Sequence, residues 1–466
     1  MSNKTNNNAD HLEVDEEEEP LLVPARRFCS RHHLHFVIGL VKLPKGARPT
    51  NCCPPKLGSK SNVIDFKLPW PSSSTTGLRI RRAAHLLDDA HIAKYRKAVE
   101  LMKALPDDDP RNFKQQANVH CAYCYGMQMP QFYTDQNSSL YDKYRNPNHQ
   151  PPKLIDLDFY MTDLNITDQQ QLLRNLNIMY RQMVSNAKTA SLFLGAPYYA
   201  GDEPMPGAGT IELVPHNSIH RWNGDTRTPN REDMGVFYSA ARDPIFYAHH
   251  PNIDRLWDIW KTLGGKNRHD FDDPDWLNAS FEFYDENAEL VSVKVKDSLD
   301  HTKLGYDYEK VDIPWLVAKP TPRKIKLKPQ NKTEKFPKVL NKKFSSVVKR
   351  PGKSRSKKEK EEEEEILVVQ VMELEMSDEF VEFDVYVNDE VDSESGPNKT
   401  EFAGSFVNLP QAHMHKGGAN YTSLFKVGIT ELIEELEVDN DDTLMVTLVP
   451  KSGIVTIEGN EIDYGS

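Results

Sequence analysis

The pattern of apolar and polar residues predicts helices in the first part of the chain. Apolar residues recur at intervals of three and four along residues 90–105 and 168–185, as on one face of a helix. A third such stretch, residues 243–263, begins with Asp-Pro, which is typical of a helix start. Proline-rich segments such as residues 146–152 separate these stretches. We therefore predict a mainly α domain with long loops.

Near the C-terminus the pattern changes to an alternation with a period of two. β-branched and aromatic residues dominate four runs bounded by Gly, Asn and Asp, namely residues 366–369, 380–387, 443–449 and 455–457. Alternation of this kind is typical of strands with one buried face. We predict a compact β-sandwich-like domain over residues 366–466.

Charge separates these two parts of the chain. Residues 319–360 are rich in Lys and Arg, contain five prolines and few large apolar residues, and run into the glutamates at 361–365. Such a segment buries too little apolar surface to fold, so we predict an exposed linker over residues 319–365 and a protease as its partner. A nucleic-acid or nuclear-targeting tract is the alternative, which the neighbouring acidic run disfavours.

Composition narrows the class of protein. The chain has 466 residues, enough for several domains, and a formal net charge of -12. We expect no transmembrane segment, because no stretch approaches about 18 consecutive apolar residues, and no nucleic-acid partner, because phosphate binding favours a basic surface. Residues 1–48 are predicted to be an unstructured or degenerate tail without a recognisable transit peptide. Arg26-Arg27 leaves a twin-arginine export remnant as an alternative.

Two clusters of histidine are the candidate chemistry. His216 and His220 are four residues apart, so on a helix both imidazoles project from one face and can share a metal. A second predicted helix carries His249 and His250. Three imidazoles without a carboxylate or thiolate ligand suit copper or zinc. Two histidines with this spacing and no other histidine cluster are usually unrelated surface residues. Here the second cluster favours a metal site.

The residues around these histidines resemble the plant polyphenol oxidases (catechol oxidases and tyrosinases), which have a coupled two-copper centre. The resemblance runs from about residue 51 to the C-terminus. Its motifs are Asn51-Cys52-Cys53-Pro54-Pro55, His120 to Cys124, both histidine segments, Asp275-Trp276-Leu277, Val311-Asp312-Ile313-Pro314-Trp315-Leu316, and Glu382-Phe383-Asp384-Val385, where the family usually has a lysine first.

The resemblance implies a fold and a domain order. Residues 49–270 would form a type-3 copper helical bundle with long loops, and residues 271–318 a bridging segment. The C-terminal β domain would then cap the copper site and keep the enzyme latent until the linker is cut.

The resemblance also implies a set of site residues. Copper would be the cofactor, with His216, His220 and His250 on the second copper and His120 as the first ligand of the other. Around the second copper, His249 would be a neighbour of the ligands, and Arg221 would follow the second ligand directly. Glu212 and Asn217 would hold a water that deprotonates a monophenol. Phe237 would be an aromatic gate over this copper. For Phe237 an ordinary core position is the alternative.

The cysteines receive roles from the same resemblance. Cys124 would donate a thioether to a copper-binding histidine. Cys121 would form a disulfide with Cys52 or Cys53, and Cys29, displaced from the family's position, is the upstream candidate for a second disulfide.

One departure from the family concerns the first copper. Each copper of such a centre needs three histidines, yet His149 is the only histidine between Cys124 and His216. The sequence predicts that an internal block has been removed, and with it two ligands. None of His85, His91 and His149 has the spacing of a replacement ligand.

Two main functional hypotheses follow. The first is a copper oxidoreductase that oxidises o-diphenols to o-quinones with dioxygen, hydroxylates monophenols, and resides in the plastid (thylakoid lumen), as the resemblance implies. The alternative is a catalytically silent, deleted family member that binds at most one copper through His216, His220 and His250. A phenol-binding or oxygen-carrying protein is a third hypothesis, which needs the same missing ligands.

Overall fold

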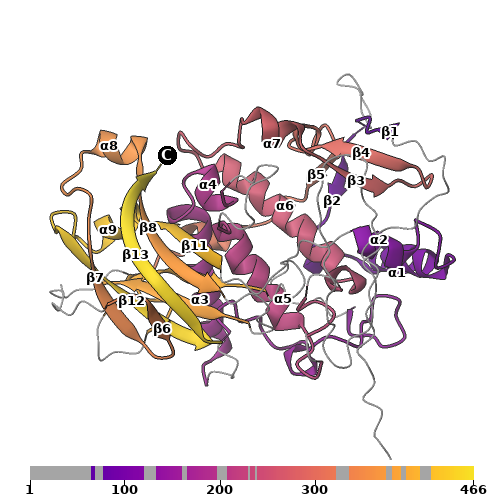
Figure 1. Cartoon of the computed structure of the whole chain (residues 1–466). Helices are drawn as coiled ribbons and strands as arrows, with labels where there is room; N and C mark the ends of the chain where they lie inside the picture. The colour runs from indigo at the N-terminus through magenta and orange to yellow at the C-terminus, as the bar shows by residue number, and fades with distance from the viewer. Residues whose placement is uncertain are drawn as a thin grey trace, which may run out of the picture.

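The structure is a computed structural model that describes residues 64–68, 77–119, 133–159, 165–196, 207–228, 231–236, 239–321, 335–373, 380–389, 395–409 and 421–465. Figure 1 shows the long helices gathered beside a separate body of strands from the C-terminal part of the chain. Within the described residues, no helix is long and apolar enough to cross a membrane.

The three predicted long helices are confirmed. They are α1 (Asp89–Ala104), α3 (Asp168–Tyr180), which continues into the π-helical turn η4 (Arg181–Ser185), and α6 (Phe246–Thr262). A capping box between Thr167 and Gln170 fixes the start of α3, because each side chain accepts a hydrogen bond from the other's backbone N–H.

Shorter helical segments complete this domain. The α-helices are α2 (Phe113–Val119), α4 (Ala190–Phe193), α5 (Ser218–Asn223) and α7 (Pro274–Asn278). The single turns are η1 (Ala84–Leu86), η3 (Pro147–His149), η6 (Ala240–Arg242), η7 (Val295–Asp297), η8 (Pro314–Val317) and the π-helix η5 (Glu212–Asn217).

Two small sheets tie residues before α1 to the bridging segment. β1 (Ile64–Asp65), β4 (Leu290–Lys294) and β3 (Ser280–Tyr284) form one sheet in the order β1-β4-β3. β2 (Arg79–Arg81) and β5 (Tyr306–Tyr308) form a parallel pair. Through these two sheets the bridging segment packs on residues that precede α1, and its Trp315 joins the apolar core that the helical domain shares with Tyr386 and Phe402 of the β domain.

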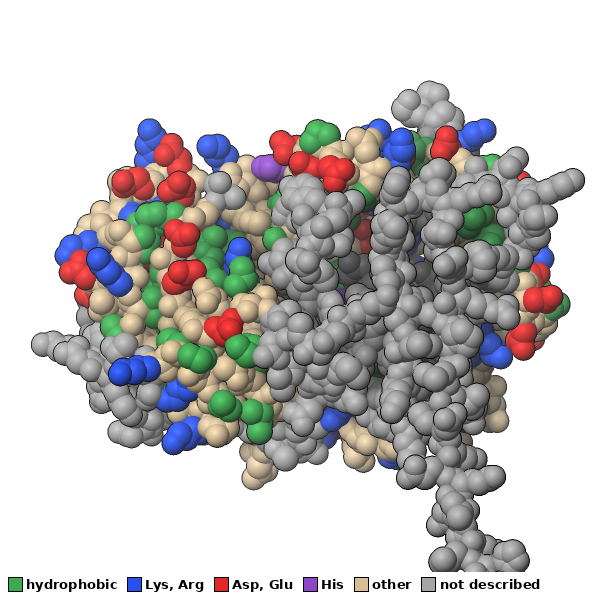
Figure 2. Space-filling view, viewed as in Figure 1, with side chains coloured by type: hydrophobic (Ala, Val, Ile, Leu, Met, Phe, Trp, Pro, Cys, Tyr) green, Lys and Arg blue, Asp and Glu red, His purple; other side chains and the backbone are tan. Residues whose placement is uncertain are grey.

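The C-terminal domain is a sandwich of two four-stranded antiparallel sheets, in the orders β10-β9-β12-β7 and β11-β8-β13-β6. Its strands are β6 (Lys338–Leu340), β7 (Phe344–Lys349), β8 (Glu364–Glu373), β9 (Glu382–Val387), β10 (Phe402–Val407), β11 (Tyr421–Gly428), β12 (Thr443–Ser452) and β13 (Val455–Gly465). Two short helices accompany them, α8 (Lys357–Glu362) and α9 (Thr430–Glu435). The predicted β-sandwich is confirmed. On the face shown in Figure 2, acidic and basic side chains are interspersed over this domain.

The predicted linker over residues 319–365 was too long. Residues 335–365 contribute β6, β7, α8 and the start of β8, and Leu340, Phe344 and Val348 are at most 5% exposed in the sandwich core. Every second residue of β7 is buried, so its lysine-rich surroundings concealed a strand. Arg350, apparently part of the basic tract, is buried in an ion pair with Glu365.

Strand β9 is buried on both faces, which joins the two domains. Phe383, Val385 and Val387 point into the sandwich core. The alternate residue Tyr386 belongs instead to a core shared with helical-domain residues such as Trp222. The polar residues on this outer face therefore meet the helical domain rather than water.

Charged pairs cross this interface. Arg221 pairs with Glu382, Arg181 with Glu435 at 2.6 Å, and Lys451 with both Asp158 and Asp384, the last at 2.9 Å. All these side chains are at most 4% exposed.

We expect Phe344→Ala to lower the free energy of unfolding of the β domain by about 3–5 kcal/mol, the usual cost of truncating a buried phenylalanine. Urea denaturation followed by circular dichroism measures it. Lys357→Ala on α8, a side chain that is 89% exposed, serves as control and should change little. If both variants changed the free energy of unfolding by equally small amounts, residues 335–365 would act as a linker.

Candidate metal centre

Two consecutive helical segments present the first two histidines. His216 lies in η5 and His220 in α5, which follows it directly. Their ring centroids are 4.9 Å apart, as expected for residues one turn apart. Both imidazoles therefore leave the chain on the same face.

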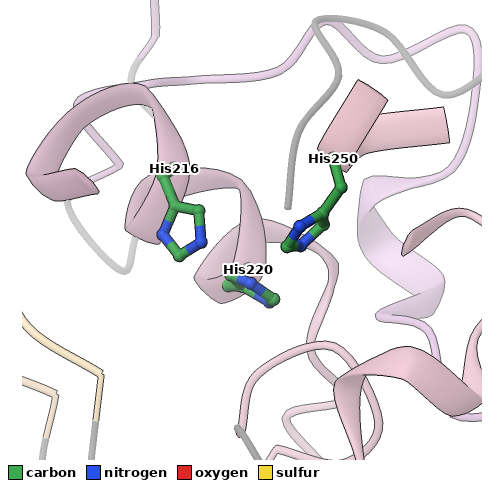
Figure 3. Close-up of side chains that lie close together, drawn as sticks. All are labelled: His216, His220 and His250. Atoms are coloured by element: carbon green, nitrogen blue, oxygen red, sulfur yellow. The ribbon is translucent and has the colours of Figure 1, made fainter. Parts of the chain in front are cut away.

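Helix α6 brings the third histidine to this face. His250 stacks on Phe246 with ring centroids 3.9 Å apart. One ligand atom from each of His216, His220 and His250 lies within 4.8 Å of the others, and Figure 3 shows the three rings converging. Imidazole nitrogens bind a first-row metal at about 2.0–2.1 Å, so small ring rotations close this three-histidine cluster around one ion.

Hydrogen bonds fix which ring nitrogen faces the metal position. His220 Nδ1 lies 2.5 Å from the carbonyl oxygen of Met234, and His216 Nδ1 lies 2.7 Å from Asn217 Oδ1. These oxygens only accept, so both Nδ1 atoms carry the proton and both Nε2 atoms keep the lone pair. His220 Nε2 is buried without a hydrogen-bond partner in the described part of the chain. This donor set fits a copper or zinc ion.

Burial keeps these imidazoles neutral. It lowers the pKa of His216 to about 4 and that of His220 to about 3, because the charged form loses its hydration. The neutral form is the one that binds a metal, so at neutral pH no proton has to be displaced.

The other predicted site residues lie around the cluster in different ways. The ring of His249 is 5.7 Å from that of His220, and burial holds its pKa well below the usual range, but it does not belong to the converging set. Burial raises the pKa of Glu212, the first residue of η5, to about 7. Arg221 is directed towards the β domain, where it pairs with Glu382.

The remaining predicted residues fall outside the described part of the chain. These are the first-copper ligand His120, the aromatic gate Phe237, the thioether donor Cys124, and the disulfide candidates Cys29, Cys52, Cys53 and Cys121.

The histidines considered as replacement ligands have other partners. His149 stacks on Trp222 with centroids 3.6 Å apart, and its Nδ1 lies 2.6 Å from the Trp222 carbonyl oxygen. His91 bonds Asp88 at the start of α1, and the exposed His85 lies in η1. None of them belongs to the converging set found among the described residues.

Two contacts at the site had no signal in the sequence. The Met234 carbonyl that holds His220 lies 14 residues away along the chain, and the carbonyl of Val407, which accepts from Asn217 Nδ2 at 2.8 Å, lies 190 residues away. Both acceptors are backbone atoms, so residue type does not indicate them.

Comparison with known proteins finds three family models that match successive parts of the chain. Residues 96–263 match the common central domain of tyrosinase, residues 270–321 the polyphenol oxidase middle domain, and residues 336–464 the chloroplastic polyphenol oxidase C-terminal domain. A chloroplastic polyphenol oxidase from Malus domestica is 49% identical, with 92% of this chain and 83% of that protein aligned. Aureusidin synthase from Antirrhinum majus is 47% identical, over 89% of this chain and 84% of that protein.

A solved structure gives the same result in three dimensions. Latent apple tyrosinase superposes with a TM-score of 0.81 at 49% identity, covering 87% of this chain and all of that one. The Malus sequence alignment spans 504 residues although only 92% of this 466-residue chain takes part. That relative therefore has residues inside the matched region that have no counterpart here.

A pair of buried carboxyl groups lies next to the Met234 carbonyl. Asp233 and Asp142 share a hydrogen bond. Burial raises the pKa of both carboxyl groups, and a nearby charge raises each further, that of Asp142 for Asp233 and that of Asp243 for Asp142; the pKa of Asp233 rises more. A carboxyl whose pKa rises on folding stabilises the protein fully below its unfolded pKa. That contribution is lost as the pH rises towards the folded pKa.

We expect Asp233→Asn to flatten the decline of stability above about pH 4, because the amide is always neutral and still donates to Asp142. Melting temperatures between pH 5 and pH 8.5 measure the slope. Asp109→Asn is the control, because Arg111 holds the pKa of Asp109 low, at about 2, and that group does not titrate in this range. If the melting temperature of Asp233→Asn fell with pH as steeply as that of the wild type, Asp233 and Asp142 would not share a proton.

Proposed function

The chain belongs to the plant polyphenol oxidase family, and from this we propose that it is a copper oxidoreductase that oxidises o-diphenols to o-quinones. Two o-diphenols would each give two electrons and two protons to one dioxygen, which yields two o-quinones and two waters. Hydroxylation of monophenols at the same centre is part of the proposal. The observation that carries it is the convergence of His216, His220 and His250.

The residues of this chain would supply a metal position and a proton acceptor. Copper bound there would supply one-electron chemistry. The three neutral imidazoles would hold the ion, and the protein interior around them would exclude bulk water. Glu212, with its pKa near 7, is suited to exchanging a proton with a phenol through a water. Asn217 already bonds His216 and Val407, so we assign it an orienting role.

A specific observation favours the alternative, a silent family member that binds a single copper. The described residues contain one converging set of three histidines, and the only histidine between Cys124 and His216 is held by Trp222. With the first copper incomplete, two-electron oxidation of a diphenol would not proceed.

Copper analysis of the purified chain, together with oxygen uptake on catechol, separates the two hypotheses. Two coppers per chain with turnover would support the oxidase, and one copper without turnover would support the silent protein. A chain that binds no copper would contradict both.

We expect His220→Ala to lose copper from the three-histidine cluster, with affinity reduced at least 100-fold, because one of three ligands is removed. His91→Ala, a surface histidine with side-chain exposure of 48%, should bind copper as the wild type does. Equal affinities of both variants would place the metal elsewhere.

The plastid is the proposed location, and the thylakoid lumen the proposed compartment, because several relatives are named chloroplastic. A protease acting between residues 321 and 335 is the proposed partner of the β domain. That segment contains five Lys and Arg residues, whereas five of the ten basic residues from Lys338 to Lys360 lie in β6, β7 and α8.

We expect limited trypsin digestion to nick the chain at residues 322–334 and leave the fragments associated. The shared apolar core and the buried Arg181–Glu435 and Lys451–Asp158 pairs would keep the domains together. Size-exclusion chromatography at neutral pH, with undigested chain as control, measures this. Separate elution of the two fragments would show that the linker alone joins the domains.

A further inference from the structure

We propose that the β domain positions two metal ligands, His216 and His220, by holding the residue that follows each of them. The inference rests on the proposed metal site and extends it, because it makes part of the C-terminal domain a support of the metal centre.

The helical spacing that brings the ligands together also brings their successors together. Asn217 and Arg221 are four residues apart, as are His216 and His220, so they share the neighbouring face of the same helical segment. Asn217 is 4% exposed and Arg221 1% exposed. One face of η5 and α5 therefore meets the metal position, and the face beside it meets the β domain.

Three residues in register across the sheet receive this face. Glu382 on β9 pairs with Val407 on β10 and with Ser452 on β12. The Val407 carbonyl accepts from Asn217 Nδ2 at 2.8 Å, Ser452 Oγ accepts from Arg221 Nη2 at 2.7 Å, and Glu382 forms the ion pair with Arg221. We call Val407, Glu382 and Ser452 the docking row.

The docking row orients the Asn217 amide, which together with the Glu212 backbone carbonyl accepts a hydrogen bond from His216. A backbone carbonyl can only accept a hydrogen bond, so the Asn217 amide must turn its NH₂ group to Val407 and its oxygen to His216. That oxygen in turn requires the proton on His216 Nδ1, which leaves Nε2 for the metal. Without Val407 the amide is free to turn over and to present a donor to Nδ1, which would leave the Glu212 backbone carbonyl as the acceptor that holds the proton there.

The ion pair fixes the helical segment at the second ligand. Arg221 follows His220 directly, and Glu382 is 2% exposed, so neither charge has water as an alternative partner. Asn217 and Arg221 are positioning residues, because each acts through the histidine before it.

The interface offers matched controls that cross it without reaching the metal position. Arg181 and Glu435 form a second buried Arg–Glu pair between the domains at 2.6 Å. Asn186 Nδ2 donates to the Ala403 carbonyl, also on β10, at 2.5 Å, while its oxygen accepts from Ser185. These bonds resemble those of the docking row, but the residues do not adjoin the histidines.

The test measures Zn²⁺ affinity of the metal-free full chain by competition with a chromogenic chelator, so turnover is not needed. Supporting groups around a metal ligand typically contribute 10–100-fold to affinity. We expect Glu382→Gln to weaken Zn²⁺ binding about 10-fold and Glu435→Gln less than 2-fold. If Glu382→Gln does not fold, the Zn²⁺ affinity of Asn217→Leu is compared with that of the control variant Asn186→Leu.

A second readout uses the reciprocity of coupled equilibria. Zn²⁺ should slow hydrogen exchange of β10 amides in the wild type and in Glu435→Gln, and less in Glu382→Gln. If Glu382→Gln and Glu435→Gln lost Zn²⁺ affinity equally, or if Zn²⁺ protected the β10 amides equally in both, the positioning role of the docking row would be overturned. The metal site itself would remain intact. A wild type that binds Zn²⁺ no better than His220→Ala would instead contradict the metal site.

Discussion

The burial of charge on the outer face of β9 is the constraint on which the arrangement of both domains depends. Glu382 and Asp384 lie on a strand that is covered on both sides, so each carboxylate needs a partner inside the protein. Arg221 comes from the helical domain, and Lys451 from β12 reaches Asp384 and the helical-domain residue Asp158 together. A shifted docking would leave these charges unpaired, so the pairs specify one relative position of the domains.

The chemistry of the three-histidine cluster follows from the same packing. The helical segment with His216 and His220 is enclosed between α6 and the β domain, and this burial keeps the imidazoles neutral. Neutral rings with the proton fixed on Nδ1 are ready to bind a metal. The supporting hydrogen bonds come from distant parts of the chain, Met234 in one case and the β domain in the other.

The contacts of His149 show why this histidine does not join the three-histidine cluster. His149 forms a hydrogen bond with the carbonyl of Trp222 and stacks on the Trp222 ring. Trp222 lies two residues after the ligand His220. Moving His149 to a metal would break a buried hydrogen bond and expose the face of a buried tryptophan. Its role is to pack the end of α5.

The sequence by itself determined the element types, the long helices, the sandwich and the shared face of His216 and His220, because apolar periodicity and the spacing of four encode them locally, whereas the packing of α6 brings His250 to that face. It misjudged residues 335–365, since a strand with alternate buried residues such as Phe344 looks polar when its lysines dominate the composition. It gave Arg221 a place beside the metal, whereas the structure turns that side chain to Glu382. Only the tertiary structure decided the tautomers and the domain contact, because backbone carbonyls such as those of Met234 and Val407 carry no sequence signal and act across 14 and 190 residues.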